Sequence, residues 1–208
     1  MKGIIFSPEM IQAVLDNRKT MTRRVIKING CPITSPKESL ELTKEGLIYH
    51  SFCSMSGYYK LLCQPGDILW VRETWAEVSS GIIEYKATYK EPYTGSAEID
   101  HIGNKIKWRP SIRMPREAAR IFLKVTNVRV ERLQDITPDN ARAEGHPQRP
   151  EISDDPQVHN DAAIDWFMDT WDYVNAKRGY GWDTNPWVWV IEFKRITKEE
   201  ALRLEGTT

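Results

Sequence analysis

The stretch Asn17-Arg18-Lys19-Thr20-Met21-Thr22-Arg23-Arg24 decides how the rest of the chain is interpreted. It follows the first predicted helix, and half of its residues are basic. Asparagine adopts a left-handed backbone more readily than most residues, so Asn17 suits the turn that ends a helix. The basic side chains predict a local site for phosphate or another anion, and a solvated basic surface explains them equally well.

Capping signals on either side of this stretch predict two short helices. Ser7-Pro8-Glu9 combines a capping hydroxyl, a first-turn proline and an early acid, which predicts a helix that runs to about Asn17. Thr137-Pro138-Asp139 repeats the signal and Gly145 follows, so a second helix is expected over residues 138–144. Apolar spacing predicts a third helix over residues 162–174.

Strand patterns are interleaved with these helices. Apolar or alternating runs predict strands over residues 2–6, 68–74, 120–132 and 187–196, the third with a bulge near Asn127. We also expect a hairpin within residues 42–50, a hairpin or flap within 79–103 and a polar loop over 146–160. Because these elements follow no regular βαβ rhythm, the pattern favours a mixed α+β barrel over a doubly wound sheet.

The bulk composition limits the protein class. The chain has 208 residues, 40% of them hydrophobic, with 29 basic and 29 acidic residues, so no whole-molecule field attracts nucleic acid. Its three cysteines form no CxxC pair, and its first apolar run ends at Ser7-Pro8. We therefore expect a cytoplasmic protein without a membrane span. Nucleotide-binding loops and metal-ligand spacings are absent from the sequence, so we expect neither a cofactor nor a metal.

The opening stretch resembles the signature of ASCH domains, in which Gly-x-Lys-x-x-Glu-x-Arg follows the first helix. Lys19 and Arg24 match this signature, while Asn17 replaces its glycine and Thr22 replaces its acid. With threonine at that position, the stretch is similar to bacterial N4-acetylcytidine amidohydrolases, small ASCH-fold enzymes with a Lys-Thr-x-Thr-x-Arg run. The resemblance implies a PUA-like (ASCH) mixed β-barrel of the α+β class, with short flanking helices and loop insertions.

The resemblance also implies a catalytic set. In those amidohydrolases a lysine, a threonine and a downstream glutamate are the proposed catalytic residues. The first two correspond to Lys19 and Thr22, and the glutamate, on the helix that starts at Ile136-Thr137, corresponds to Glu144. Amide hydrolysis needs a nucleophile, a base and a positive group near the developing oxyanion, and these residue types supply them.

The role of each catalytic residue stays open at the level of sequence. Thr22 is either the nucleophile or the group that positions a water molecule. Lys19 is the base if Arg18, Arg23 and Arg24 lower its pKa, and otherwise the oxyanion partner. A purely binding interpretation assigns Lys19 and Arg24 to phosphate and Glu144 to a neighbouring base.

The resemblance covers about half of the chain. We expect one ASCH/PUA-like domain over residues 1–196, with insertions at about 28–63, 76–113 and 146–160, and a charged tail or frayed helix over 197–208. Together with Val71-Arg72-Glu73-Thr74-Trp75 and Arg178-Gly179-Tyr180-Gly181-Trp182, these insertions make the chain similar to longer ASCH-related proteins of phages and prophages. The insertions leave the identity of its ligand open.

Several residues outside the opening stretch are candidates for ligand contact. Glu73 shares a strand face with Val71 and is either a pocket carboxylate or the solvated end of that strand. The segment 108–116 interleaves arginines, tryptophan and proline, which suits stacking and phosphate contacts with a single strand. The predicted substrate- or RNA-binding residues are Arg18, Arg23, Arg24, Glu73, Trp75, Trp108, Arg109, Arg113 and Trp182.

These residues and the resemblance lead to one main hypothesis. The protein is expected to recognise RNA or a modified nucleoside, and its enzymatic form would hydrolyse an amide of the N4-acetylcytidine type. The alternatives are a non-catalytic RNA-binding module, a ribonuclease that acts on single-stranded RNA, and a phage interaction protein with a vestigial cleft.

Overall fold

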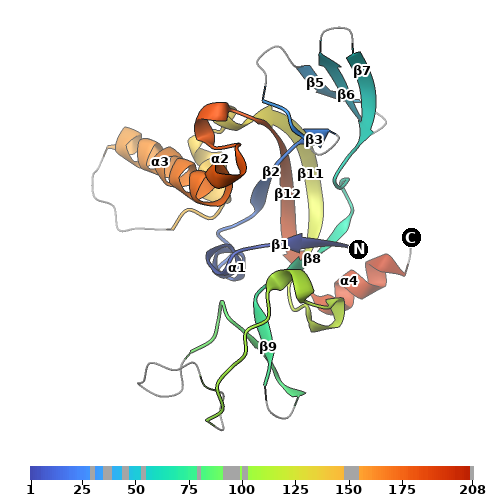
Figure 1. The fold of residues 1–208 in the computed structure, drawn as a ribbon, viewed down its shortest axis with the longest axis vertical. Helices are drawn as coiled ribbons and strands as arrows, with labels where there is room; N and C mark the ends of the chain where they lie inside the picture. Colours follow the sequence, from blue (N-terminus) through green and yellow to red (C-terminus); the bar gives the residue numbers. More distant parts are fainter. Residues whose placement is uncertain are drawn as a thin grey trace. The chain divides into compact units, whose positions relative to one another are not determined.

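The computed structural model describes residues 1–28, 31–34, 39–43, 47–52, 55–78, 81–90, 99, 103–147 and 155–206. The chain forms two compact units, whose elements are labelled in Figure 1. Unit 1 contains Met1–Asn17, Ile68–Lys124 and Arg195–Thr208, and unit 2 contains Arg18–Asp67 and Val125–Lys194. Two long strands, β11 (Phe122–Arg132) and β12 (Trp187–Ile196), contribute residues to both units, so the chain passes repeatedly from one unit to the other.

Unit 1 begins with the first strand and first helix that the sequence predicts. Strand β1 (Lys2–Ile5) pairs in parallel with β8 (Ile68–Arg72), and β8 pairs antiparallel with the start of β11. Helix α1 (Pro8–Leu15) starts where the Ser7 hydroxyl accepts a hydrogen bond from the Met10 amide at 3.3 Å. Asn17 has a left-handed backbone, with φ of 59°. The predicted cap and helix-ending turn are therefore confirmed, although the helix ends two residues earlier than expected.

The segment predicted to be a charged tail or frayed helix is a packed helix. Helix α4 (Lys198–Glu205) is capped by Thr197, and its Ala201 is fully buried in the core of unit 1. The N-terminal ammonium of Met1 lies 2.8 Å from the Glu205 carboxylate, which fixes the end of this helix. Charge dominates the sequence of α4, so its one buried alanine left no apolar pattern to detect. The core that it joins contains Ile68, Trp75, Met114, Ala118, Ala119, Phe122 and Ile196.

The predicted flap of unit 1 contains a short hairpin. Strand β9 (Trp75–Glu77) pairs antiparallel with β10 (Ile83–Tyr85). Ala76 of this hairpin belongs to a small separate cluster with Val78 and Ile106. Two 3₁₀ helices, Ser111–Arg113 and Arg116–Ala118, then lead into β11. Residues 79–80, 91–98 and 100–102 of the predicted flap lie outside the described part of the chain.

Unit 2 is built on three neighbouring strands. In hydrogen-bonded order β11 is followed by β12 and then by β2 (Met21–Val25), and β2 and β12 are antiparallel. Strand β12 has the bounds that the sequence predicts. Thr126 and Asn127 are consecutive residues and both are exposed. They interrupt the alternation of buried and exposed side chains along β11 near the position where a bulge was expected.

Two helices pack together in unit 2, as Figure 1 shows at its left. Helix α2 (Pro138–Ala143) is capped by Thr137 and ends at Glu144, before the left-handed Gly145, as predicted. Helix α3 (Pro156–Asn175) starts earlier than expected, because Asp155 caps it and Pro156 occupies its first turn. Residues 156–160 of the predicted polar loop are therefore helical, and residues 148–154 of it lie outside the described part of the chain. The core of this unit contains Met21, Leu133, Ile136, Ala141, Ala163, Phe167, Trp171, Val188 and Val190.

The first predicted insertion forms small sheets in unit 2. Strand β3 (Lys27–Ile28) pairs with β4 (Cys31–Pro32), and β5 (Ser39–Leu42), β6 (Leu47–Phe52) and β7 (Met55–Lys60) form a three-stranded antiparallel sheet. Leu42 pairs with Ile48 across the β5–β6 hairpin, which confirms the predicted hairpin. Strand β7 was not predicted, because serine, glycine and tyrosine give no clear period there.

The secondary structure confirms the α+β class. Helices and several sheets are mixed along the chain in both units. Across the part of the chain that the structure describes, none of the helices combines the length and the apolar character that a membrane span requires.

Candidate functional site

The backbone brings the start of β2 and the end of α2 together inside unit 2. Lys19 and Glu144 form an isolated antiparallel bridge, and the Thr20 amide donates to the Ala143 carbonyl at 2.9 Å. The left-handed turn at Asn17 directs the chain into this position, and the left-handed Gly145 ends the helix on the other side. Two residues that are 125 positions apart thus face each other because of two local turns.

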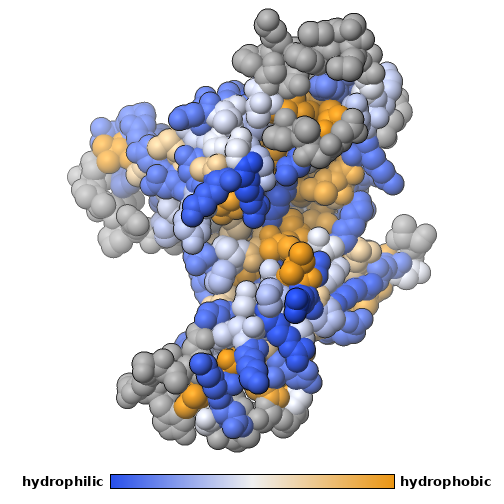
Figure 2. Space-filling view, viewed as in Figure 1, coloured by the Kyte–Doolittle hydropathy of each residue, from blue (hydrophilic) through white to orange (hydrophobic). Residues whose placement is uncertain are grey.

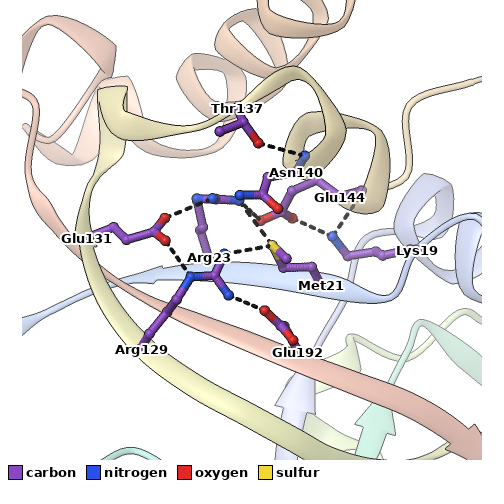
Figure 3. Close-up of polar contacts among 9 residues, drawn as sticks. All are labelled: Lys19, Met21, Arg23, Arg129, Glu131, Thr137, Asn140, Glu144 and Glu192. Carbon is purple, nitrogen blue, oxygen red and sulfur yellow. Dashed lines mark hydrogen bonds and ion pairs between the residues drawn. The ribbon is translucent and has the colours of Figure 1, made fainter. Parts of the chain in front are cut away.

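Lys19 and Glu144 form a buried ion pair, which Figure 3 shows. The Nζ atom of Lys19 lies 2.6 Å from Oε2 of Glu144 and 2.8 Å from the carbonyl oxygen of the same residue. Arg23 donates from one guanidinium nitrogen to the other carboxylate oxygen, Oε1, at 3.2 Å. Lys19, Arg23 and Glu144 are only 2%, 3% and 6% exposed, so these charges interact in a low-dielectric environment.

A second layer of charges holds Arg23. Its other terminal nitrogen lies 3.1 Å from the Glu131 carboxylate. Arg129 bridges Glu131 to Glu192 through short ion pairs, so three strands contribute to one network (Figure 3). The network contains three cationic and three anionic side chains, which balances its charge within the protein. The sequence analysis did not predict that Arg129, Glu131 and Glu192 belong to this site. Their charges on two largely buried strands could have indicated a buried ion-pair network.

Thr22 lies beside this network. It is 1% exposed and pairs with Ile191 in the β2–β12 ladder. Because side chains alternate along a strand, Thr22 and Arg23 point to opposite faces of β2. Within the described part of the chain, the network of Figure 3 includes Lys19, Arg23 and Glu144 but not Thr22. The structure therefore brings together two members of the predicted catalytic set and places the third on the neighbouring strand face.

Two further arginines of the opening stretch flank the pair. Arg18 donates to the carbonyl oxygens of Gly145 and His146 at 2.7 and 3.3 Å, which attaches it to the end of α2. Arg24 is partly buried on β2, opposite Trp189 of β12. Burial lowers the pKa of Arg24 from its ordinary value, against the opposing effect of the Glu144 carboxylate.

The environment of Lys19 makes its ammonium proton easier to remove than that of an exposed lysine. Burial lowers the pKa of Lys19 below the ordinary lysine value, and the nearby charges of Arg24 and Arg23 add to this effect. The Glu144 carboxylate opposes it. The sequence left open whether neighbouring arginines lower this pKa, and the larger cause of the shift is loss of water around the ammonium.

Arg23 offers an unused hydrogen-bond donor in this site. Its Nε atom is buried and has no hydrogen-bond partner, while both of its terminal nitrogens bind carboxylates. A buried donor without an acceptor costs about 1–3 kcal/mol, so a bound acceptor atom would be stabilised there. The site therefore combines a buried amine, a carboxylate and a positively charged donor.

Glu73, the other predicted acid, belongs to unit 1. It is 2% exposed, and both of its oxygens bind Arg120, at 2.9 and 2.8 Å. The Arg120 guanidinium also lies 4.0 Å from the ring centroid of Tyr85 and donates to the Thr88 hydroxyl. Glu73 is thus a buried carboxylate, as one of the two sequence interpretations proposed, with its own cation.

Arg120 is more exposed than its partner Glu73, so removing each of the two side chains should change the free energy of unfolding by a different amount. Arg120→Met is expected to destabilise the protein by about 2–3 kcal/mol, because it leaves the Glu73 carboxylate buried without a partner. Glu73→Leu should cost clearly less, because Arg120 is partly exposed, keeps contact with Tyr85 and Thr88 and can be hydrated. Urea unfolding of both variants measures the difference. Equal losses would contradict this account.

The predicted aromatic contacts are mainly packing contacts. Trp75 is 5% exposed, and the Arg109 guanidinium covers its ring at 4.9 Å, so a base reaches this ring only if those contacts open. Trp108 contacts Tyr89 edge-on and packs against the small cluster of unit 1. Trp182 contacts Phe167 edge-on at 6.2 Å in unit 2. Arg113 is exposed at the end of its 3₁₀ helix and remains available to a ligand.

No family model, curated protein or solved structure matches this chain. Among the described residues, no group of three or more histidine, cysteine, aspartate and glutamate side chains is arranged to hold a metal ion. The functional argument therefore depends on the chemistry of the residues around Lys19 and Glu144.

Proposed function

We propose that this protein is a PUA-like, ASCH-type barrel protein that recognises RNA or a modified nucleoside and hydrolyses an amide of the N4-acetylcytidine type. The observation that supports this proposal is the buried contact of 2.6 Å between Lys19 and Glu144, two of the three residues that the family resemblance assigns to catalysis. The lowered pKa of Lys19 adds a chemical reason, because a neutral amine at this position is a general base.

The proposed reaction begins with water as the nucleophile. A neutral lysine amine has two N–H groups and one lone pair. Both N–H groups have acceptors on Glu144, its carboxylate and its carbonyl oxygen, which orients the amine so that its lone pair can take a proton from water. The water oxygen then forms a bond to the amide carbon, and the carbonyl oxygen becomes an oxyanion.

Breakdown of this intermediate completes the reaction. The carbon–nitrogen bond breaks, and the protonated Lys19 returns its proton to the leaving N4 amine, which leaves the lysine neutral again. Cytidine and acetic acid are released, and the acid loses its proton to solvent as acetate. The Nε–H of Arg23 is a buried cationic donor available for the oxyanion. Arg24 and Arg18 provide positive charge for a substrate phosphate.

A non-catalytic RNA-binding module is the second candidate. The balanced charges of the network favour it, because they show that Lys19 and Glu144 also have a structural role in joining α2 to β2. In that case the arginines of the opening stretch would bind phosphate and no bond would be broken.

Incubation of the purified protein with N4-acetylcytidine tests the proposal, with cytidine and acetate measured chromatographically. We expect turnover, and we expect kcat/KM to rise with pH as Lys19 loses its proton. The midpoint of this rise should lie below the ordinary lysine pKa, because burial favours the neutral amine in the folded protein. Above that midpoint the rate should become constant.

A second measurement separates the two candidates. Binding of single-stranded RNA at two salt concentrations reports the phosphate contacts that both candidates share. Salt-dependent binding without turnover of any N-acylated cytidine would contradict the hydrolase and support the binding module. A protein that neither binds single-stranded RNA nor turns over an N-acylated cytidine would contradict the nucleic-acid hypothesis as a whole.

A further inference from the structure

A pocket of about 250 Å³ lies in unit 2 between β2, β3, β12 and the inserted strand β7. One side comes from the chain that continues β2, and the other from the three-stranded sheet of β5, β6 and β7. Figure 2 shows hydrophobic surface in the neighbourhood of β3. The main lining residues are Ile26, Lys27, Ile28, Tyr59, Lys60 and Trp189.

Two lysines give this pocket a positive side. Lys60 is exposed at the end of β7 and is one of the residues that line the pocket. Lys27 lies on β3, and its Nζ atom is 3.3 Å from the Tyr180 hydroxyl and 4.8 Å from the centroid of that ring. Among the described residues that line the pocket none is acidic, so the two ammonium groups favour an anionic ligand.

Aromatic side chains provide the apolar part. The ring of Tyr59 lies over Gly57, where an added Cβ atom would be 3.2 Å from the tyrosine hydroxyl oxygen. His50 contacts the same ring edge-on at 6.1 Å between centroids. These two contacts fix the orientation of Tyr59 before a ligand arrives. Trp189, which is 6% exposed, adds a second aromatic group to the pocket lining.

We infer that this pocket binds a nucleoside monophosphate unit, either free or as part of an RNA strand. The phosphate would be held by Lys27 and Lys60, and the base would contact Tyr59 and the apolar residues of the lining. The volume is just below the range of about 300–1,000 Å³ for sites that take drug-sized ligands, which limits the ligand to about one nucleotide. The inserted sheet thus has a role in recognition.

This pocket uses none of the residues assigned to hydrolysis. Lys19, Arg23 and Glu144 do not line it, so binding and turnover are separable by mutation. A protein that turns over N4-acetylcytidine but does not bind a nucleotide here would contradict only this inference. A protein that binds the nucleotide without turnover would contradict only the proposed hydrolase.

Calorimetric titration with cytidine 5′-monophosphate, cytidine and inorganic phosphate tests the inference. We expect the monophosphate to bind more tightly than either of its parts, and more weakly at higher salt. Lys60→Gln and Tyr59→Leu should each lower its affinity about five- to tenfold, as expected for one charge-assisted hydrogen bond or one base-stacking contact. Lys177→Gln is the matched control, because Lys177 is exposed in unit 2 and does not line the pocket.

A short single-stranded oligoribonucleotide, titrated in parallel, identifies the source of the nucleotide. Tighter binding than the monophosphate with the same dependence on Lys60 supports a unit of RNA, and equal or weaker binding supports a free nucleotide. The inference is overturned if neither ligand binds, if phosphate alone binds as tightly as the monophosphate, or if Lys177→Gln weakens binding as much as Lys60→Gln.

Discussion

Lys19→Met is expected to lower kcat/KM for N4-acetylcytidine by a factor of about 10²–10⁴, the usual contribution of a positioned general base. Methionine fills a similar volume without a proton acceptor, so the loss reports the amine rather than a cavity. Glu144 keeps its contact with Arg23 in this variant, which limits the effect on folding. Steady-state kinetics by chromatography measures the change, and circular dichroism checks the fold.

Two further variants make this result interpretable. Thr22→Val keeps the shape of the side chain and removes its hydroxyl. If water is the nucleophile, this variant should retain most of its activity, whereas a loss as large as that of Lys19→Met would assign the nucleophile to Thr22. Lys177→Met changes an exposed lysine in the same unit and should leave turnover unchanged. Full activity in Lys19→Met would exclude the proposed base.

Arg23→Met is expected to destabilise the protein by about 3–5 kcal/mol, as is usual when one partner of a buried ion pair is removed. Arg23 binds both Glu144 and Glu131, and its side chain is completely buried, so its loss leaves two carboxylates with fewer partners. Its guanidinium also lies 5.6 Å from the Phe167 ring centroid, which adds a packing contribution. Urea unfolding of the purified variant measures the loss.

An exposed arginine and a double variant are the controls for this prediction. Arg195→Met alters a solvent-exposed arginine of β12, and its effect should stay within about 0.5 kcal/mol. Adding Glu131→Gln to Arg23→Met should restore part of the lost stability, because Glu131 has lost one of its two cationic partners, keeps only Arg129, and is then neutral. If Arg23→Met unfolds at the same urea concentration as the wild-type protein, the network does not stabilise the fold.

Local features of the chain were predictable because neighbouring residues cause them. Ser7 and Thr137 cap their helices through hydroxyls that bind amides three residues later, and the turn at Asn17 needs only the conformational tolerance of asparagine. Strand β12 was predicted with its observed bounds because five apolar residues begin it and Phe193 and Ile196 continue the pattern between charged residues. The start of α3 was missed because the polar residues after Pro156 looked like a loop.

The sequence by itself determined the α+β class, the caps and turns, and the choice of Lys19, Thr22 and Glu144 as candidates. Tertiary structure decided which of these residues meet, because the 2.6 Å pair joins positions 125 residues apart and depends on how α2 lies on β2. It also decided that Arg23 and Glu131 join that pair, that Thr22 faces away from Arg23, and that β7 lines a pocket. Such contacts depend on strand register and on the packing of distant segments, which no local pattern encodes.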